Sequence, residues 1–343
     1  MRILMPVDGS EYSKAAVAFV ASRTTLLKNP TEIELVNIQY PVPPRAARAL
    51  GKEFVQSYHE AEAAKALKSA AAALKRAGAN TVARYAVGTV AHKLASIVAN
   101  DRADLIVIGS HGHTGLKKLL LGSVADTVAV SCTKPLLVVR GAPVPKRDSL
   151  RLGIAVDGSP YGLAVARFVA RHRDLFGASP SVCLIHVVPD LSKVTVPGWI
   201  EREVPTGIKP EQVDAMQKAA FENVFRPVHE LLATAGISAT EVRLVGQVPG
   251  DAIAAQATKS KLDLLALGSL GFGAARHAPM GSVATRVAAR CRTALLLVRE
   301  KKCLRPQKGA SPREKDMSPA HVDHSQAPMA PSPTIGTVVN ERL

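Results

Sequence analysis

The chain has 343 residues, with 44 Lys and Arg against 28 Asp and Glu and a formal net charge of +16. At roughly 150 residues per domain this length suggests two domains. Cys132, Cys183, Cys291 and Cys303 have neither C-x-x-C nor metal-ligand spacing, which excludes a disulfide framework and a zinc module. No apolar run approaches the roughly 20 residues that span a bilayer, and Asp8 comes too early for a signal peptide. We therefore expect a cytoplasmic protein with no membrane partner.

The positive charge is spread along the chain rather than gathered in one block. Aromatic residues make up only 4% of the chain, which leaves few side chains on which bases can stack. No recognised nucleic-acid motif appears. We therefore do not expect a nucleic-acid partner and interpret the charge as a solvated basic surface.

Apolar runs and helical spacings alternate along the first 141 residues. Residues 2–7 form a short apolar run that ends at a turn, as expected for a strand buried on both faces. Ser10 then precedes apolar residues at helical spacing and is a candidate N-cap. The patterns predict strands at 2–7, 32–39, 81–87, 104–109 and 136–140, and helices at 10–27, 53–77, 89–100 and 122–131. This alternation predicts the doubly wound α/β class, a parallel sheet with helices on both faces.

The same pattern returns in the second half of the chain. Met-Pro-Val-Asp-Gly-Ser at 5–10 returns as Ile-Ala-Val-Asp-Gly-Ser at 154–159, and Asp-Leu-Ile-Val-Ile-Gly-Ser at 104–110 returns as Asp-Leu-Leu-Ala-Leu-Gly-Ser at 263–269. Matching strands are expected near 151–156, 181–188, 240–245, 263–268 and 294–299. The chain then divides into a first domain at 1–141, a Pro-rich connector at 142–149, a second domain at 150–300, and a tail at 301–343 whose composition predicts disorder.

A glycine motif follows the fourth strand of each copy. Its spacing is G-x2-G-x9-G-S in both, and the final Gly-Ser opens a predicted helix. Glycines let the backbone approach a ligand so that amides point at phosphate oxygens, and a helix N-terminus favours an anion. We therefore expect two phosphate-binding loops, although turn and N-cap roles alone would also explain such residues. The motif comprises Gly109, Gly112, Gly122 and Ser123 in the first copy, and Gly268, Gly271, Gly281 and Ser282 in the second.

These residues carry a family resemblance. The chain resembles a tandem universal stress protein, two UspA-type domains in one polypeptide, of the branch whose glycine motif binds ATP. The resemblance covers about 300 of the 343 residues. It implies a five-stranded parallel sheet in each domain, an intramolecular pseudo-dimer of the two repeats or a homodimer, and ATP as ligand, with or without Mg²⁺.

The resemblance also implies roles for residues at the ends of the strands. The acidic residues Asp8 and Asp157 are expected to contact the ribose or base, although both also fit an Asp-Gly-Ser turn. Ile38 and Val187 are expected to pack near the adenine, and the glycines and serines to hold the phosphates. The neighbouring residues expected to line the same sites are Val7, Val124, Val156 and Val283.

The second copy departs from this pattern. Ala294 replaces Pro135, and Leu270 replaces His111, which puts the equivalence of the second site in question. His111 is expected either to touch phosphate or to be an inert loop residue. His186 is expected to be a hydrogen-bonded core residue. Loop residues that could attract phosphate by their charge are Lys117 and Lys118 in the first copy, and Arg276 and His277 in the second.

Two classes of function fit these features. The first is an ATP-binding stress-response or signalling module. The second is an enzyme, a slow ATPase or a relative of adenine-nucleotide hydrolases. Fast hydrolysis needs a positioned base and a metal clamp, and no base or Walker-type lysine can be assigned. We therefore expect at most weak ATP hydrolysis, no catalytic residue, and no metal-binding cluster.

Overall fold

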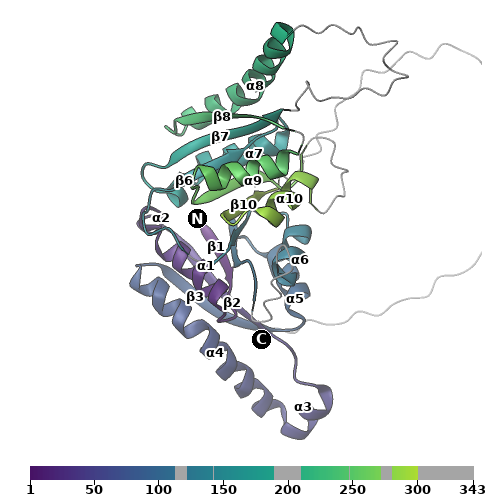
Figure 1. Cartoon of the computed structure of the whole chain (residues 1–343). Helices are drawn as coiled ribbons and strands as arrows, with labels where there is room; N and C mark the ends of the chain where they lie inside the picture. The colour runs from purple at the N-terminus through teal and green to yellow at the C-terminus, as the bar shows by residue number, and fades with distance from the viewer. Residues whose placement is uncertain (113–121, 142, 189–209, 247, 272–279, 300–343) are drawn as a thin grey trace, which may run out of the picture. The chain divides into compact units, whose positions relative to one another are not determined.

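The computed structural model describes residues 1–112, 122–141, 143–188, 210–246, 248–271 and 280–299, which belong to one compact unit (Figure 1). The predicted tail at 301–343 lies outside the described residues. So do the loop residues Lys117, Lys118, Arg276 and His277. The boundaries of the two domains stay a prediction.

The first copy contains five strands and six helices in its described part. Most bounds lie within two residues of the expected ones. The elements are β1 (Arg2–Pro6), α1 (Glu11–Ala21), α2 (Thr24–Leu27), β2 (Glu32–Gln39), α3 (Pro44–Leu50), α4 (Lys52–Arg76), β3 (Asn80–Val87), α5 (Val90–Asn100), β4 (Leu105–Gly109), α6 (Ser123–Ser131) and β5 (Leu136–Val139).

The second copy follows the same order in its described part, with a short 3₁₀ helix where the first has α2 and no described counterpart of α3. The elements are β6 (Arg151–Ala155), α7 (Pro160–Arg171), η1 (Arg173–Phe176), β7 (Ser181–Val188), α8 (Pro210–Ala233), β8 (Ala239–Val245), α9 (Pro249–Lys259), β9 (Leu264–Gly268), α10 (Ser282–Arg290) and β10 (Ala294–Val298).

Two helices differ from the expectation. The helix expected at 10–27 divides into α1 and α2 at Arg23, whose side chain is fully buried. The expectation also missed α3, which begins at Pro44 and ends before Gly51. Proline fits the first turn of a helix, and Gly51 has a φ of 82°, which favours glycine and ends the helix.

All ten strands form one sheet, in the order β3-β2-β1-β4-β5-β10-β9-β6-β7-β8. Within each copy the five strands are parallel, as expected. The two halves join where β5 pairs antiparallel with β10, with Leu297 opposite Leu136. The pseudo-dimer that the resemblance implies therefore corresponds here to one continuous sheet.

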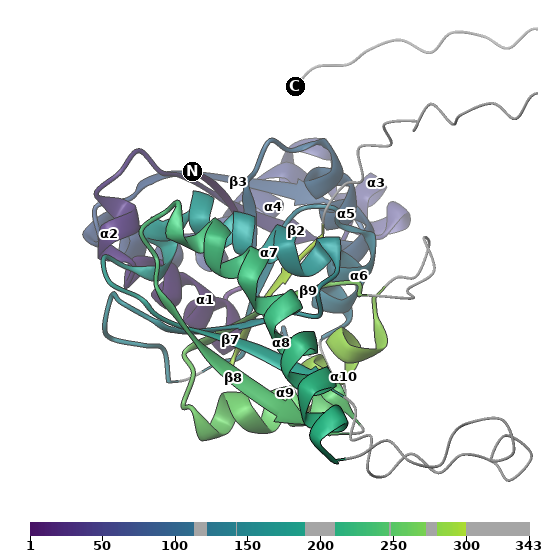
Figure 2. The ribbon, with the colours of Figure 1, turned by 90° about the horizontal axis from the view of Figure 1, so that it is seen from above.

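The core has two layers, one on each face of the sheet. On one face, Phe19 of α1 and Phe225 of α8 belong to a cluster that also includes residues of α4 and α7. On the other face, Leu94 of α5 and Val287 of α10 belong to a cluster with residues of α6 and α9. Figures 1 and 2 show helices on both sides of the strands. This is the doubly wound arrangement, and its strand order reverses between β1 and β4 and between β6 and β9, where ligands bind in such sheets.

The connector between the copies is held by Arg23. Its guanidinium donates to the carbonyl oxygens of Arg147 and Asp148, each at 2.6 Å, and to that of Pro145 at 3.3 Å. Burial lowers the pKa of Arg23, and the nearby Asp148 opposes this shift. Hydrogen bonds from the Arg23 side chain to backbone carbonyl oxygens therefore hold the connector against the first copy.

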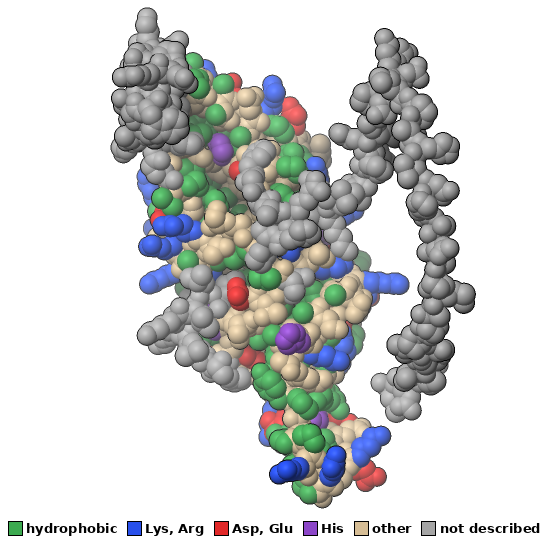
Figure 3. Space-filling view, turned by 90° about the vertical axis from the view of Figure 1, so that its right-hand side faces the viewer, with side chains coloured by type: hydrophobic (Ala, Val, Ile, Leu, Met, Phe, Trp, Pro, Cys, Tyr) green, Lys and Arg blue, Asp and Glu red, His purple; other side chains and the backbone are tan. Residues whose placement is uncertain are grey.

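Charged side chains are dispersed on the face that Figure 3 shows. Lys and Arg lie at several separate places, with Asp and Glu side chains between some of them. Within the described ranges, every helix is too short or too polar to cross a membrane.

Candidate functional site

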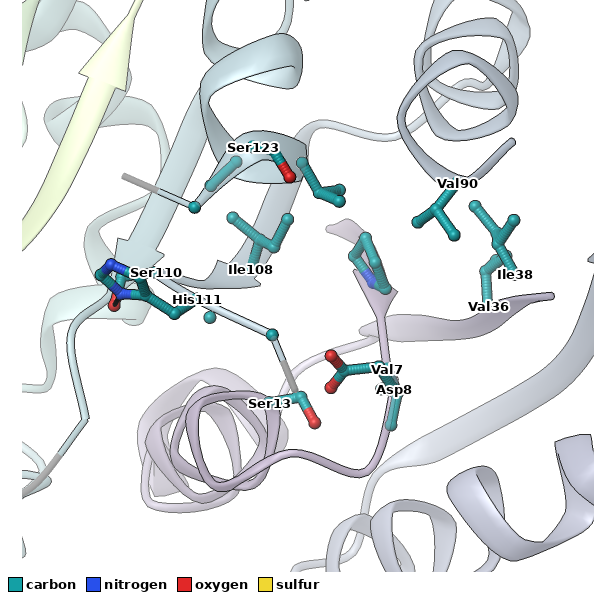
Figure 4. A pocket seen from close by; sticks show the side chains of 16 residues that line it. Val7, Asp8, Ser13, Val36, Ile38, Val90, Ile108, Ser110, His111 and Ser123 are labelled. Atoms are coloured by element: carbon teal, nitrogen blue, oxygen red, sulfur yellow. Dashed lines mark hydrogen bonds between the residues drawn. The ribbon is translucent and has the colours of Figure 1, made fainter. Parts of the chain in front are cut away.

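The first candidate site is a pocket at the carboxyl ends of β1 and β4, where the strand order reverses (Figure 4). The pocket is an open hollow with about 900 Å³ of empty space, a figure that includes space open to solvent. All eight residues expected here line it: Val7, Asp8, Ile38, Gly109, Gly112, Gly122, Ser123 and Val124.

The second candidate site is the matching pocket at the carboxyl ends of β6 and β9, with about 1060 Å³ of empty space that likewise includes space open to solvent. The replacements that put its equivalence in question do not remove it, and Leu270 lies in its lining. The eight residues expected here also come together: Val156, Asp157, Val187, Gly268, Gly271, Gly281, Ser282 and Val283. Their roles in nucleotide binding stay predictions.

One side of the first pocket is apolar. Figure 4 shows Val36, Ile38 and Val90 side by side, with Ile108 on the wall below Ser123. The sequence reasoning missed Val90, which is the first residue of α5. A usable signal was present, because the carboxyl end of β3 meets the same sheet edge as those of β1 and β4. In the second copy Pro249 begins α9 and lines the pocket in the same way.

The two aspartates have matching environments. Asp8 Oδ1 accepts a hydrogen bond from the Ser10 amide at 2.9 Å, and Asp157 Oδ1 accepts one from the Ser159 amide at 3.0 Å. The turn role considered for these residues is therefore real. Each also lines its pocket, and the second carboxylate oxygen lies beside a glycine of the motif, Asp8 Oδ2 beside Gly112 and Asp157 Oδ2 beside Gly271. One oxygen closes the turn, and the carboxylate still faces the site.

The helices that enter the pockets begin differently from α1 and α7. The latter are capped by serine hydroxyls, since Ser10 accepts from the Ser13 amide and Ser159 accepts from the Gly162 amide. The N-cap residues of α6 and α10 are Gly122 and Gly281, which have no side chain to cap with. The first four amides of a helix, counted from the N-cap, have no carbonyl within the helix to bind, and here the N-cap amide binds Ser110 or Ser269 instead. The amides left for a ligand are those of Ser123, Val124 and Ala125 in α6 and of Ser282, Val283 and Ala284 in α10.

The glycines themselves serve different purposes. The Gly122 amide donates to the Ser110 carbonyl at 2.6 Å, and the Gly281 amide donates to the Ser269 carbonyl at 2.8 Å. These two amides are therefore already hydrogen-bonded within the protein. The candidate phosphate donors are instead the amides that follow them, which begin at Ser123 and Ser282. A Cβ on Gly109 would lie 2.6 Å from the backbone carbon of Tyr12. Glycine is required there because α1 packs against β4 at that point.

Histidine 111 turns toward its neighbour in the chain. Its Nδ1 lies 3.0 Å from Ser110 Oγ, and its ring centroid lies 5.1 Å from that of Tyr12 (Figure 4). In the second copy Leu270 takes this place. There Ser269 Oγ accepts a hydrogen bond from Arg299 Nε at 3.2 Å. The difference between His111 and Leu270 thus changes the partner of the buried serine.

Histidine 186 is hydrogen-bonded, as predicted, and it is half-buried. Its Nδ1 lies 2.8 Å from the Val156 carbonyl oxygen, so this nitrogen carries a proton. The ring meets Phe221 and Phe225 edge-on. Burial lowers the pKa of His186, while the Val156 carbonyl and Asp157 partly oppose this. Asn37 makes the same contact in the first copy, donating to the Val7 carbonyl at 2.8 Å.

The comparison with known proteins follows the same division into copies. The family model for universal stress proteins matches residues 1–140 and again residues 150–299. The chain belongs to the universal stress protein family. It therefore carries two universal stress protein domains in tandem.

Relatives support both the family and the tandem arrangement. A universal stress protein of Mycolicibacterium smegmatis is 27% identical over 305 residues, which cover 87% of this chain and 96% of the relative. Universal stress protein MJ0531 of Methanocaldococcus jannaschii is 29% identical over 148 residues, 43% of this chain and 84% of the relative. The crystal structure of a universal stress protein from Archaeoglobus fulgidus superimposes with a TM-score of 0.61 at 18% identity, covering 87% of this chain and 98% of that one. That likeness shows the shared fold.

Proposed function

We propose that each domain binds one ATP and that the protein is a nucleotide-dependent stress-response or signalling module. The observation that carries this proposal is the glycine-capped helix at each pocket. Gly122 and Gly281 leave the first amides of α6 and α10 without a side-chain cap, and both helices open into pockets with apolar walls. A helix N-terminus without a capping side chain beside an apolar wall suits a ligand with a phosphate end and a flat apolar end.

The pocket divides into parts that match the parts of ATP. The adenine is assigned to the wall formed by Ile38 and Val90, and the matching wall in the second domain contains Val187 and Pro249. The ribose hydroxyls are assigned to the carboxylate of Asp8 or Asp157, because an ionised carboxylate accepts hydrogen bonds from hydroxyls.

The phosphates are assigned to the start of each helix. The free amides of α6 begin at Ser123, whose hydroxyl adds one donor, and Ser282 does the same in α10. The described residues contain no group of three or more His, Cys, Asp or Glu side chains arranged to hold a metal ion. Mg²⁺ would therefore arrive bound to the phosphates of the nucleotide, with oxygen ligands supplied mainly by phosphate and water.

Binding is favoured over rapid hydrolysis by the residues that line the pockets. Among the described lining residues the only carboxylates are Asp8 in the first pocket and Asp157 in the second. Each has one oxygen engaged in a turn, and each is assigned to the ribose. No further carboxylate is present in the described lining to activate water near the phosphates. His111 lines the first pocket, but its ring nitrogen Nδ1 lies against Ser110, and Leu270 takes its place in the second pocket. Slow ATP hydrolysis is the second candidate function, and turnover is expected well below the roughly 1 to 1000 per second of ordinary enzymes.

Two measurements test the proposal. Mass spectrometry of the nucleotide released from purified protein identifies the ligand, and calorimetric titration with ATP counts the sites. We expect two ATP per chain, falling to one in Gly112→Val and to one in Gly271→Val, because each branched side chain displaces the aspartate carboxylate beside it. A folded parent chain that binds no adenine nucleotide overturns the proposal. One site in the parent that survives Gly271→Val makes the second domain a structural partner only.

A further inference from the structure

Two arginines cross between the domains where β5 meets β10. Arg140 directly follows β5 and donates from Nη2 to the carbonyl oxygen of Ala288, in the last turn of α10. Arg299 directly follows β10 and donates from Nη1 to the carbonyl oxygen of Val130, in the last turn of α6, at 3.1 Å. Each domain therefore places a cation at the carboxyl end of the helix whose amino end lines the other domain's pocket.

Arg299 also holds the pocket loop of its own domain. Its Nε donates to Ser269 Oγ at 3.2 Å, and this serine is buried. Ser269 lies between Gly268 and Leu270, which both line the second pocket. One side chain thus joins the loop of the second pocket to the helix that enters the first.

Arg140 makes no hydrogen bond to the described residues of its own domain's pocket loop that would match the bond from Arg299 to Ser269. Its Nε is buried without a hydrogen-bond partner among the described residues. The serine that would correspond to Ser269 is Ser110, and its hydroxyl lies against His111 Nδ1 instead. Leu270 stands where His111 does and offers no polar atom, so the Ser269 hydroxyl is left for Arg299. The two domains are therefore connected asymmetrically, and the asymmetry traces to one sequence difference.

We propose that the two pockets are coupled through Arg299, so that a nucleotide in the second pocket tightens nucleotide binding in the first. This inference rests on the proposed function, because both pockets must take a ligand. A nucleotide bound against residues 268–271 restrains the Ser269 hydroxyl, and the hydroxyl restrains Arg299. Arg299 then keeps its bond to Val130, so α6 has lost part of its conformational freedom before the first pocket fills. Because α6 is already ordered, nucleotide binding in the first pocket loses less conformational entropy and is tighter.

The effect is expected to be moderate and reciprocal. Couplings of this kind usually change affinity by about 5-fold to 150-fold, and linkage requires that each ligand affect the other equally. Two hydrogen bonds on one side chain place the expected change at the lower end, about 5-fold. Arg140 is not expected to couple the pockets in this way, because its Nε makes no hydrogen bond to Ser110 in the loop of the first pocket.

Hydrogen–deuterium exchange in α6 of the full chain tests the coupling. The first pocket is blocked by Gly112→Val, and ATP is added to saturate the second. We expect amide exchange in the last turn of α6 to slow about threefold or more, although no ligand occupies the pocket that α6 enters. Ser269→Ala in the same background removes the acceptor for Arg299 Nε and is expected to abolish the slowing. Arg140→Lys is the matched control and is expected to leave it in place.

Calorimetry supplies the second readout. In the chain with both pockets intact, Ser269→Ala is expected to weaken ATP binding at the first site about 5-fold, and Arg140→Lys is not. ATP binding to Gly112→Val without any change in α6 exchange overturns the coupling, and so does slowing that persists in Ser269→Ala. If Gly112→Val binds no ATP while the parent binds one, the second site and the coupling both fail. A parent that binds no ATP overturns the proposed function itself.

Discussion

Asp8 and Gly112 lie so close together that a side chain at residue 112 would displace the Asp8 carboxylate. A Cβ on Gly112 would come within 2.8 Å of Asp8 Oδ2, and a Cβ on Gly271 would come within 2.7 Å of Asp157 Oδ2. The second glycine of each motif therefore lies beside the aspartate that follows the first strand of its copy. The same relationship appears in both domains.

This relationship predicts the effect of Gly112→Ala. The added methyl group meets the end of a side chain, which can move, so the fold is expected to tolerate it with a loss of about 1 kcal/mol or less. The displaced carboxylate leaves the ribose position, and ATP affinity at the first site is expected to fall at least tenfold by calorimetry. Gly109→Ala is the contrasting variant, because its methyl group meets the Tyr12 backbone. It is expected to cost about 1 to 3 kcal/mol in urea unfolding. Equal destabilisation by both variants would contradict this assignment.

Because the N-cap of α10 is a glycine, we expect Gly281→Asp to raise the stability of the second domain and to abolish its ATP binding. An added Cβ at residue 281 has its nearest neighbour at 3.4 Å, so the side chain fits. An aspartate there can accept from the first amides of α10, and we expect it to stabilise the domain by a few tenths of a kcal/mol or more. The same carboxylate occupies the phosphate position and repels it. ATP binding at the second site should therefore be lost while the melting temperature holds or rises.

A matched variant separates charge from occupancy. Gly281→Asn also caps the helix but carries no charge, so it is expected to weaken ATP binding less than Gly281→Asp at low salt. Full ATP affinity at two sites in Gly281→Asp would show that the α10 amides do not hold phosphate.

The buried Arg23 predicts a strong dependence of the fold on one cation. Arg23→Met keeps much of the volume but leaves the carbonyl oxygens of Arg147 and Asp148 without their donor. The fully buried Arg23 side chain is removed, and an acceptor that loses its donor while shielded from water costs up to about 1 to 3 kcal/mol. We expect a loss of roughly 2 to 4 kcal/mol in urea unfolding, whereas Arg2→Met, on the exposed surface, should change it by less than about 1 kcal/mol. A loss below 1 kcal/mol for Arg23→Met would mean that the connector is not held by this side chain.

His186 predicts a pH dependence of stability. Burial lowers its pKa below the ordinary value of 6.5, so the unfolded chain binds this proton more readily than the folded one. The folded state is therefore favoured fully above about pH 6.5 and loses stability as the pH falls below it. His186→Asn, which copies Asn37 of the first domain, should reduce the loss of unfolding free energy between pH 7.5 and 5.5. His172 also has a pKa lowered by burial, so part of the dependence should remain. An unchanged pH dependence in His186→Asn would contradict this account.

Much of the site could be predicted from the sequence because its parts are local. A strand followed closely by Asp-Gly-Ser, and a Gly-Ser pair that opens a helix, each have a structure set by neighbouring residues. The internal repeat strengthened the prediction, since the spacing G-x2-G-x9-G-S would seldom occur by chance at matching positions of both copies. Val90 was not predicted, because its place in the pocket depends on which strand ends lie at the same edge of the sheet.

The sequence by itself determined the fold class, the family and the sixteen residues that gather in two pockets, because buried strands, glycine turns and helix starts are encoded by adjacent side chains. Only the tertiary structure decided the rest. It made one sheet from two by pairing β5 with β10, and it interrupted the expected helix between α1 and α2, where Arg23 binds the distant connector. It also engaged the amides of Gly122 and Gly281, and it joined Arg299 to both domains. These contacts connect residues far apart in the chain, and no local pattern of residues specifies such partners.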